Sequence, residues 1–286
     1  MEEDIKSFLD YLTKERKYSS NTQAAYRSDL AQLAAYVKSS SSTGEAGALR
    51  LLNAELLSGY MRDLREKKYA QSTVARKIAA AKSFLKFMVD TGRLSGDLAP
   101  NLASPQVNKP MPKHLSVSEV RHFLAEPAKL SSVEAKRDRA MLEMLYATGL
   151  RASELMALNV DDVDLRANKV RCCGGKSGVR VIPMDGHITQ IIKEYISEVR
   201  PKLVNSEMEI ALFPNRRGER LTRQGFWQII QGYADKAGLS GKVTPRSLRH
   251  SFASHKLSGG ADLEYVQQLL GHTHLSTTKV YQDVRV

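Results

Sequence analysis

Four prolines lie close together near the middle of the chain: Pro100, Pro105, Pro110 and Pro112. This cluster most constrains the fold, because proline lacks a backbone N–H donor and pushes the preceding residue toward an extended conformation. A helix cannot run through such a segment. We therefore place a stiff, basic linker at residues 105–113, between a first domain at 1–104 and a second at 114–286. A chain of 286 residues is long enough for two such domains.

The first domain shows helical spacing of apolar residues in four segments. The expected helices are Ile5–Thr13, a second that is capped by Ser20 and stops near Lys38, a third at Ala54–Arg65, and a fourth that is capped by Ser72 and reaches Met88. The run between Ser39 and Gly47 has little to bury, and we expect a mobile loop there. The polar side of the fourth helix carries four cations: Arg76, Lys77, Lys82 and Lys86. This basic face either is simply solvated or lies along DNA.

The second domain mixes helices with a short hairpin. Gly149 should end a helix, which places Arg151 at the entry to the next one. The segments Lys169–Cys173 and Val179–Pro183 predict two strands joined by a turn that contains Lys176. The remaining expected helices include one around the aromatic pair Phe226 and Trp227, which we assign to the core, one that begins at Thr244, one that ends at Gly271, and a last one that is capped by Ser276 and carries Tyr281. The fold class is thus mainly α, with a small β-sheet in the C-terminal domain.

Charge and composition narrow the class of protein. Lys and Arg total 43 against 31 Asp and Glu, and a net charge of +12 attracts a polyanion, although a generally solvated basic surface explains it equally well. No window approaches the roughly 18 apolar residues of a membrane span, and the first residues are acidic where a secretory signal is basic, which indicates a cytoplasmic protein. The only cysteines, Cys172 and Cys173, are adjacent and have no histidine or further cysteine partners, so we expect them to form no zinc site.

Five cationic or potentially cationic side chains stand beside turns or helix starts in separate segments: Arg151, Lys176, Arg246, Arg249 and His272. A fold could bring such groups together on one phosphate, because arginine forks match phosphate oxygens. Tyr281 follows the pair Gly271-His272 by nine residues. A lone tyrosine here is usually a packing aromatic, but a tyrosine facing a cationic phosphate pocket indicates phosphoryl transfer with a tyrosine nucleophile.

Four of these features occur in one order along the chain: Ala147-Thr148-Gly149-Leu150-Arg151-Ala152-Ser153-Glu154-Leu155, then Leu248-Arg249-His250, then Leu270-Gly271-His272, then Tyr281. In this order the chain resembles a tyrosine recombinase of the phage integrase family, of the Xer type. The resemblance extends to the first domain through Phe8–Leu12 and Ser20-Asn21-Thr22, so it covers nearly the whole length.

The resemblance implies a two-domain DNA clamp, with a helical, SAM-like core-binding domain and a catalytic domain. It also implies a site-specific recombinase that works as a tetramer on two double-stranded DNA sites. DNA strands would be cut and rejoined through a 3'-phosphotyrosyl bond to Tyr281, without a metal or cofactor. Arg151 and Arg249 would hold the phosphate oxygens, His272 would donate a further hydrogen bond, and Lys176 would protonate the leaving oxygen. By the same resemblance, the best candidates for DNA contacts in the first domain are Arg76 and Lys77.

Two features depart from the family. Arg246 stands where a histidine is usual, and a guanidinium can stabilise an oxyanion but cannot accept the tyrosine proton at neutral pH. This leaves open natural activity with another proton acceptor, reduced activity, or an engineered slow step. Only residues 282–286 follow Tyr281, whereas relatives often carry a further helix that docks on a neighbouring subunit. Subunit coupling is therefore expected to be weaker or to use other surfaces. The alternatives are a catalytically impaired DNA-binding or architectural protein of the same fold and a metal-dependent nuclease, which EDTA would inhibit.

Overall fold

The computed structural model describes residues 1–286 apart from 41–51, 106–113, 174–177, 207 and 282–286. The chain forms two compact units, Met1–Lys109 and Pro110–Val286. The division falls inside the expected linker, most of which lies outside the described residues, as does most of the expected loop after Ser39. The exact domain boundaries therefore stay a prediction.

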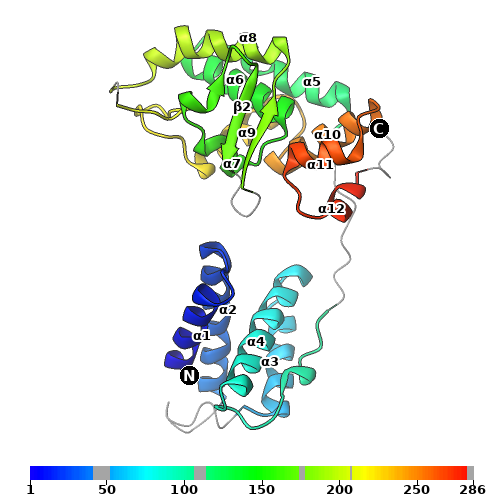
Figure 1. Cartoon of the computed structure of the whole chain (residues 1–286). Coiled ribbons are helices and arrows are strands. Elements are labelled where there is room, and N and C mark those ends of the chain that lie inside the picture. Colours follow the sequence, from blue (N-terminus) through cyan, green and yellow to red (C-terminus); the bar gives the residue numbers. More distant parts are fainter. Residues whose placement is uncertain (41–51, 106–113, 174–177, 207, 282–286) are drawn as a thin grey trace. The chain divides into compact units, whose positions relative to one another are not determined.

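The helices of the first unit are shown in Figure 1 and span α1 (Glu2–Lys14), α2 (Ser20–Ser39), α3 (Ala54–Glu66) and α4 (Gln71–Asp90), before a single 3-10 turn at Ala99–Asn101. The four predicted helices are confirmed, but two caps are wrong. Ser19 rather than Ser20 caps α2, because its extended backbone lets its hydroxyl accept from the Thr22 N–H at 3.3 Å. Ser72 lies inside the first turn of α4, so it cannot cap that helix.

The core of the first unit forms where α1, α2 and α4 pack against one another. Phe8 of α1 meets Phe84 of α4 edge to face, with ring centroids 5.6 Å apart. Leu30 of α2 and Ile78 of α4 are fully buried beside them. This apolar spacing is what the sequence pattern predicts for amphipathic helices around one core.

The second unit contains the elements α5 (Val117–Ala125), α6 (Val133–Thr148), α7 (Ala152–Ala157), β1 (Val163–Asp164), β2 (Lys169–Cys173), β3 (Val179–Pro183), α8 (Gly186–Glu194), α9 (Arg223–Lys236), α10 (Pro245–Ser258), α11 (Leu263–Leu270) and α12 (Leu275–Lys279). Single 3-10 turns lie at Pro127–Lys129, Val160–Asp162 and Arg200–Lys202, and a π-helical turn at Tyr195–Val199 continues α8. The predicted hairpin is confirmed: β2 pairs antiparallel with β3, with Val170 opposite Ile182. The sequence missed β1, which adds a third antiparallel strand beside β2.

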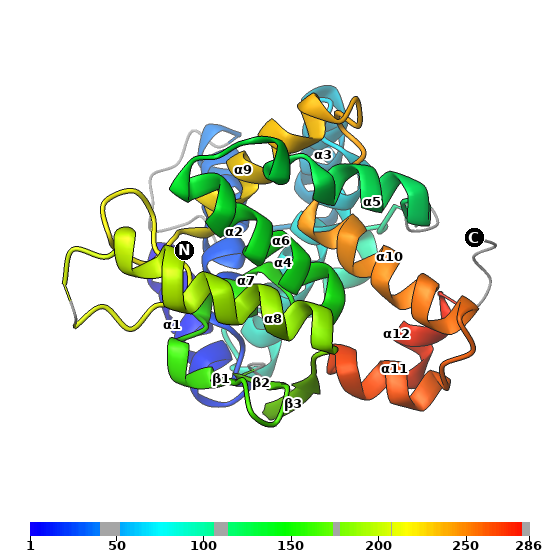
Figure 2. The same cartoon turned by 90° about the horizontal axis from the view of Figure 1, so that it is seen from above.

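Helix α6 supplies much of the core of the second unit, because it packs against both α8 and α10 (Figure 2). Two expectations for this unit are wrong. Trp227 is 52% exposed, because it lies one position outside the buried stripe that Phe226 and Ile230 form on α9. His274, not Ser276, precedes α12, and that helix ends at Lys279, so Tyr281 stands in the turn that follows it.

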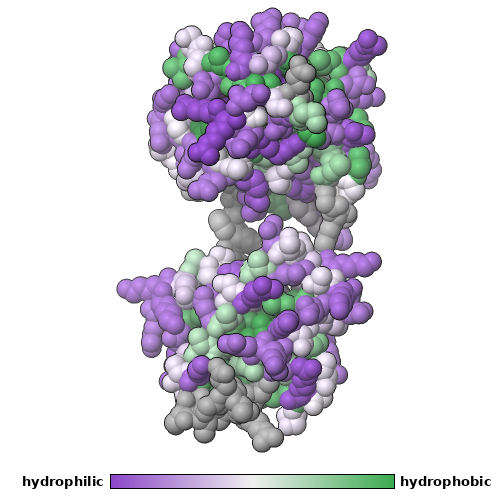
Figure 3. Space-filling view, turned by 90° about the vertical axis from the view of Figure 1, so that its left-hand side faces the viewer, coloured by the Kyte–Doolittle hydropathy of each residue, from purple (hydrophilic) through white to green (hydrophobic). Residues whose placement is uncertain are grey.

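Polar side chains, drawn in purple in Figure 3, cover most of the visible face of each unit. None of the helices in the described part of the chain has the length and apolar content that a membrane span requires.

Candidate active site

Arg151 is positioned by a sharp break between two helices. Gly149 ends α6 in the left-handed conformation with φ +61°, and a Cβ at this position would lie 2.3 Å from the Phe252 ring. Glycine is therefore required both for the backbone conformation and for space. The break places Arg151 directly before α7, with its side chain 38% exposed.

The two carboxylate oxygens of Glu154 accept hydrogen bonds from the surrounding arginines. Arg151 Nη1 donates to Oε1 at 2.7 Å, while Arg180 Nη1 and Nη2 donate to Oε1 and Oε2 at 2.8 and 2.7 Å. Burial of Glu154 raises the pKa of its carboxyl, but the hydrogen bonds from Arg180 and Arg151 outweigh it and lower that pKa to about 2. The carboxylate is thus charged at neutral pH, although the residue is only 5% exposed.

Arg249 is buried at the same place, at 7% exposure, on the second turn of α10. Its Nη1 donates to the carbonyl of Gly149 and its Nη2 to that of Leu270, both at 2.5 Å, and Nη1 lies 3.9 Å from Glu154 Oε2. Burial, followed by the charge of Arg151, lowers the pKa of Arg249 to about 10, so it remains a cation at neutral pH. We call Arg151, Glu154, Arg180 and Arg249 the arginine cluster. It holds three cations and one carboxylate.

His272 extends this cluster toward Tyr281. Gly271 ends α11 with φ +62°, and its carbonyl accepts from Arg151 Nη2 at 3.2 Å. The His272 Nε2 atom lies 3.2 Å from Arg249 Nη2, and its Nδ1 atom lies 2.9 Å from the Thr278 hydroxyl. Burial and then the charges of Arg249 and Arg151 lower the pKa of His272 to about 4, so its ring is neutral. Because arginine only donates, Nε2 accepts in this structure, and a bound phosphate would have to replace that bond before Nε2 could donate.

Tyr281 lies beside His272 but bonds to a different histidine. The two rings are close to parallel, at 24°, with centroids 6.4 Å apart. The Tyr281 hydroxyl lies 2.6 Å from His250 Nδ1, and the residue is only 5% exposed. Burial raises the pKa of Tyr281, while the charges of Arg249, Arg246 and Arg151 oppose that effect. The phenol therefore carries its proton at neutral pH.

Arg246 does not reach the tyrosine directly. Its side chain is exposed, and its Nε donates to His250 Nε2 at 3.0 Å, one turn along α10. The tyrosine and Arg246 are thus connected through the His250 ring. The predicted acid, Lys176, falls between β2 and β3 but outside the described residues, so its place in the site stays a prediction.

The two predicted DNA contacts on α4 are held by a buried carboxylate. Asp29 of α2 pairs with Arg76 Nη1 and with Lys77 Nζ, the latter at 3.0 Å, and Lys77 also donates to Gln32 Oε1 at 2.7 Å. Lys77 is 4% exposed, so its expected place on the polar side of α4 is wrong: Asp29 needs a buried counter-charge. The Arg76 side chain remains largely exposed. We call Asp29, Arg76 and Lys77 the aspartate cluster.

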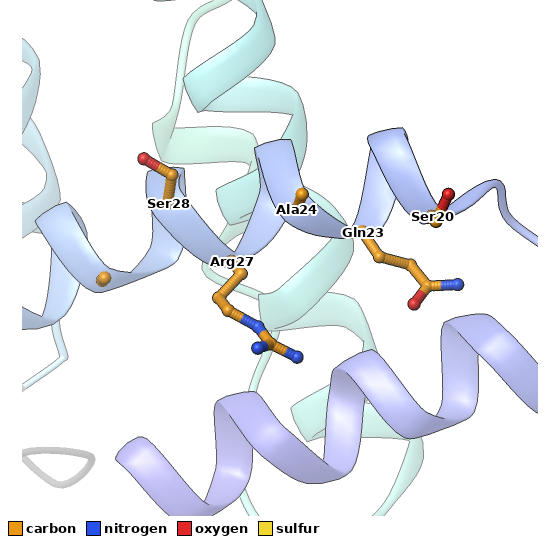
Figure 4. A pocket seen from close by; sticks show the side chains of 6 residues that line it. Ser20, Gln23, Ala24, Arg27 and Ser28 are labelled. Atoms are coloured by element: carbon orange, nitrogen blue, oxygen red, sulfur yellow. The ribbon is translucent and has the colours of Figure 1, made fainter. Parts of the chain in front are cut away.

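A hollow lies on the outer face of α2 in the first unit (Figure 4). It is lined by Ser20, Gln23, Ala24, Arg27, Ser28 and Ala31. It offers one cation but no carboxylate, histidine or cysteine, and hence no general acid or base for catalysis. In the described part of the chain, no three His, Cys, Asp or Glu side chains come close enough together to hold a metal ion.

Sequence reasoning missed two residues of this site, Arg180 and His250. Arg180 pairs with buried Cys172 across the hairpin, so the strand register alone places it on the inward face. His250 lies four residues after Arg246 on one helix, a spacing that brings two side chains together.

Comparisons with known proteins show the family to which the chain belongs. Residues 113–286 match the model of the Phage integrase family, and residues 5–92 match that of the Phage integrase, N-terminal SAM-like domain. The chain therefore belongs to the phage integrase family. It is 44% identical to Tyrosine recombinase XerC of Roseiflexus sp. (strain RS-1) over 99% of this chain and 90% of that protein. It is 38% identical to Tyrosine recombinase XerD of Oceanobacillus iheyensis over 99% of this chain and 94% of that protein.

These relatives place the chain among the Xer-like tyrosine recombinases, and the predicted class of enzyme is confirmed. A crystal structure of XerH site-specific recombinase bound to palindromic difH substrate has the same fold, with a TM-score of 0.77 and 21% identity over 98% of this chain and 81% of that one. The predicted fold class, helical with a small sheet in the catalytic domain, is confirmed as well.

Proposed function

We propose that this recombinase cuts and rejoins DNA at a specific recombination site, with Tyr281 as nucleophile and the arginine cluster as the phosphate site. One observation carries the proposal. Arg151, Arg249 and His272 come from three separate segments and meet around the carbonyls of Leu270 and Gly271, beside the Tyr281 ring. Cations that converge next to a tyrosine hydroxyl fit a phosphodiester under attack.

The chemistry follows from this placement. The Tyr281 oxygen attacks phosphorus, which forms the 3'-phosphotyrosyl bond and breaks the bond to the 5' oxygen. The guanidinium groups of Arg151 and Arg249 stabilise the negative charge that develops on the non-bridging oxygens. Glu154 keeps Arg151 in place by accepting its hydrogen bond. Arg180 in turn holds Glu154, because it donates to both of its carboxylate oxygens. Lys176 supplies the proton to the departing 5' oxygen, and the 5' hydroxyl later reverses the reaction on a partner strand.

His272 has a double role in this proposal. Its Nε2 now accepts from Arg249, so it helps to hold that guanidinium while no phosphate is bound. When a phosphate oxygen draws Arg249 away, the ring can exchange its proton and donate to the oxygen. Thr278, which contacts Nδ1 at 2.9 Å, can accept from or donate to the ring, so it tolerates both tautomers.

The assembly and its place in the cell are part of the same proposal. Strand exchange between two duplexes needs four cuts, so four copies would act together on two sites. The basic net charge of +12 would favour binding to the DNA backbone. We place this activity in the cytoplasm, with Arg76 as a backbone contact on the first unit.

Covalent trapping tests the proposal. A DNA duplex that is nicked shortly after the scissile phosphate loses, on cleavage, the short fragment that carries the new 5' hydroxyl, so the protein stays attached to the 3' phosphate. We expect a covalent protein–DNA band in EDTA from the chain as given, and none from Tyr281→Phe, which retains the ring but lacks the nucleophilic oxygen. DNA binding by Tyr281→Phe in a gel-shift assay is the control for folding. A band of equal strength from Tyr281→Phe would show that another residue attacks.

A further inference from the structure

The Tyr281 oxygen has a close partner that none of the predicted catalytic roles uses. His250 Nδ1 lies 2.6 Å from it, and the two ring centroids are 5.1 Å apart. This is the distance of a strong hydrogen bond, and it involves the atom that must attack phosphorus. Which of the two groups donates decides what His250 does in the reaction.

The other side of the His250 ring answers this question. Arg246 Nε lies 3.0 Å from His250 Nε2, and an arginine side chain has donors but no acceptor. The Nε2 atom must therefore present its lone pair to Arg246. Burial, followed by the charges of Arg246 and Arg249, lowers the pKa of His250 to about 4, so the ring carries a single proton at neutral pH. That proton has to be on Nδ1, from which it points to the Tyr281 oxygen.

We propose that His250 is a further catalytic residue, which donates its Nδ1–H to the Tyr281 oxygen, and that Arg246 is a positioning residue, which fixes this tautomer of the ring. The proposal rests on Tyr281 being the nucleophile. It means that Arg246 does not replace the usual histidine as a base. It converts the neighbouring histidine into a donor that favours the tyrosinate over the phenol.

The proton balance of each step follows. In cleavage the Tyr281 phenol loses its proton to solvent water, the O–P bond forms, and the 5' oxygen leaves with a proton from Lys176. His250 keeps its proton throughout and stabilises the negative charge as the phenol ionises. In rejoining, Tyr281 leaves as tyrosinate, and the same N–H stabilises the departing oxygen before water returns the proton.

The groups that face this pair come from three elements and their flanking turns. They are Arg246 and Arg249 of α10, Arg151 before α7, and His272 after α11. The three arginines favour an anionic oxygen on Tyr281, and His272 is neutral. The surroundings therefore act in the same direction as a donated hydrogen bond.

The tautomer can be measured directly, without DNA. Long-range proton–nitrogen NMR spectra of histidine rings distinguish a proton on Nδ1 from one on Nε2. We expect His250 to carry its proton on Nδ1 in the chain as given, and to convert to the Nε2 form or a mixture in Arg246→Met. His255, which lies on the same helix with its Nδ1 atom 2.7 Å from the Tyr146 hydroxyl, is the matched control and should not change. A His250 proton on Nε2 in the chain as given would overturn the proposal, whether or not Tyr281 is the nucleophile.

Replacement of His250 tests the donor in the reaction itself. In His250→Asn the amide N–H can occupy the place of Nδ1–H, whereas His250→Asp puts an acceptor there. We expect single-turnover cleavage of nicked DNA to fall less than about tenfold in His250→Asn and at least about 100-fold in His250→Asp, the usual effect of losing one such donor. Equal rates in the two variants, or a faster Asp variant, would contradict the donor role. Thermal unfolding of both variants separates this effect from a loss of fold.

The pH profile isolates the role of Arg246. In Arg246→Glu a carboxylate would accept from Nε2–H, which leaves Nδ1 as an acceptor and makes His250 a base. The rate of that variant should fall as the pH drops through a histidine pKa near about 6.5. The chain as given should lack this step. A step of this kind in the given chain that disappears in His250→Asn would show that His250 already acts as a base, and would overturn the proposal.

Discussion

The aspartate cluster of the first unit and the arginine cluster of the second each surround a buried carboxylate with cations, and they use those cations differently. In the aspartate cluster the Lys77 side chain is 3% exposed, and its ammonium contacts both Asp29 and Gln32. In the arginine cluster the Arg151 side chain is 38% exposed, and Arg249 also contacts His272. In the first cluster two cations, one of them a buried lysine, pair with one carboxylate. In the second, three arginines surround one carboxylate. Exposure alone does not separate the clusters, because Arg76 is at least as exposed as Arg151. We propose the arginine cluster as the functional site because it lies beside His272 and Tyr281.

The largest expected difference between the two clusters is in the cleavage rate after the charge of each carboxylate is removed. Glu154→Gln and Asp29→Asn should each lower the free energy of unfolding by about 3–5 kcal/mol, because each leaves buried cations without their partner. Only Glu154→Gln should also slow cleavage, since Arg151 loses its anchor. Chemical denaturation and single-turnover cleavage at saturating protein would measure both effects. Equal loss of cleavage in Asp29→Asn would break the comparison.

Low pH should protonate Glu154 and thereby remove its contribution to the stability of the arginine cluster. Its pKa of about 2 lies below the ordinary value of 4.5, so its stabilising contribution is complete above about pH 4.5 and is lost as the pH falls toward 2. The shift corresponds to a contribution on the order of 3 kcal/mol. The difference in unfolding free energy between the chain and Glu154→Gln should therefore shrink between pH 5 and about pH 2. A difference that stays constant over this range would show that the Glu154 charge is not what stabilises the cluster.

Replacing an arginine by lysine keeps the charge but removes the planar group, so it tests whether each cluster depends on the geometry of the guanidinium. Arg151→Lys should reduce cleavage by about 100-fold, because a lysine cannot hold Glu154, the Gly271 carbonyl and a phosphate oxygen with one planar group. Arg76→Lys should change cleavage by less than about threefold, since a single ammonium can pair with Asp29. Both rates are measured on the same nicked DNA. A comparable loss in the two variants would mean that the position of Arg151 beside Tyr281 and His272 does not distinguish the two clusters.

The smallest expected effect concerns DNA affinity. Arg76→Ala should reduce the slope of log affinity against log salt concentration by about one unit, because one exposed phosphate contact is lost. Lys77→Met should leave that slope unchanged, because its ammonium is buried against Asp29. Fluorescence anisotropy titrations over a range of salt would resolve the two. A reduced slope in Lys77→Met would show that the aspartate cluster opens on DNA.

The helices and the hairpin could be predicted because their signals are local. Apolar spacing, capping residues such as Thr244, and end signals such as Gly149 and Gly271 depend on neighbours in sequence. The wrong caps at Ser20, Ser72 and Ser276 are local shifts of a helix start by a few residues. The wrong burial assignments arose where distant contacts decide. Lys77 looks like a surface lysine until Asp29, 48 residues away, is placed against it, and the exposure of Trp227 depends on how α9 is rotated against its neighbours.

The residues of the site could be predicted from the sequence, but the hydrogen bonds that connect them could not. The order of the motifs predicted, through the resemblance, that Arg151, Arg249, His272 and Tyr281 lie close together. It could not show that Arg246 reaches Tyr281 only through His250, because that depends on side-chain directions on one face of α10. Arg180 was missed for a related reason: an arginine between two valines looks like an outward strand residue, although here Val179 and Val181 are the exposed ones.

The most direct test of the account identifies the atom that becomes linked to DNA. The trapped complex can be digested with nuclease and protease, and the phosphorylated peptide located by mass spectrometry. We predict a single nucleotide-linked peptide, which contains Tyr281, and its loss in Arg249→Gln, in which the neighbouring guanidinium is removed. A nucleotide attached to any other tyrosine, or to a serine, would contradict the assignment of the arginine cluster and Tyr281 as the catalytic centre.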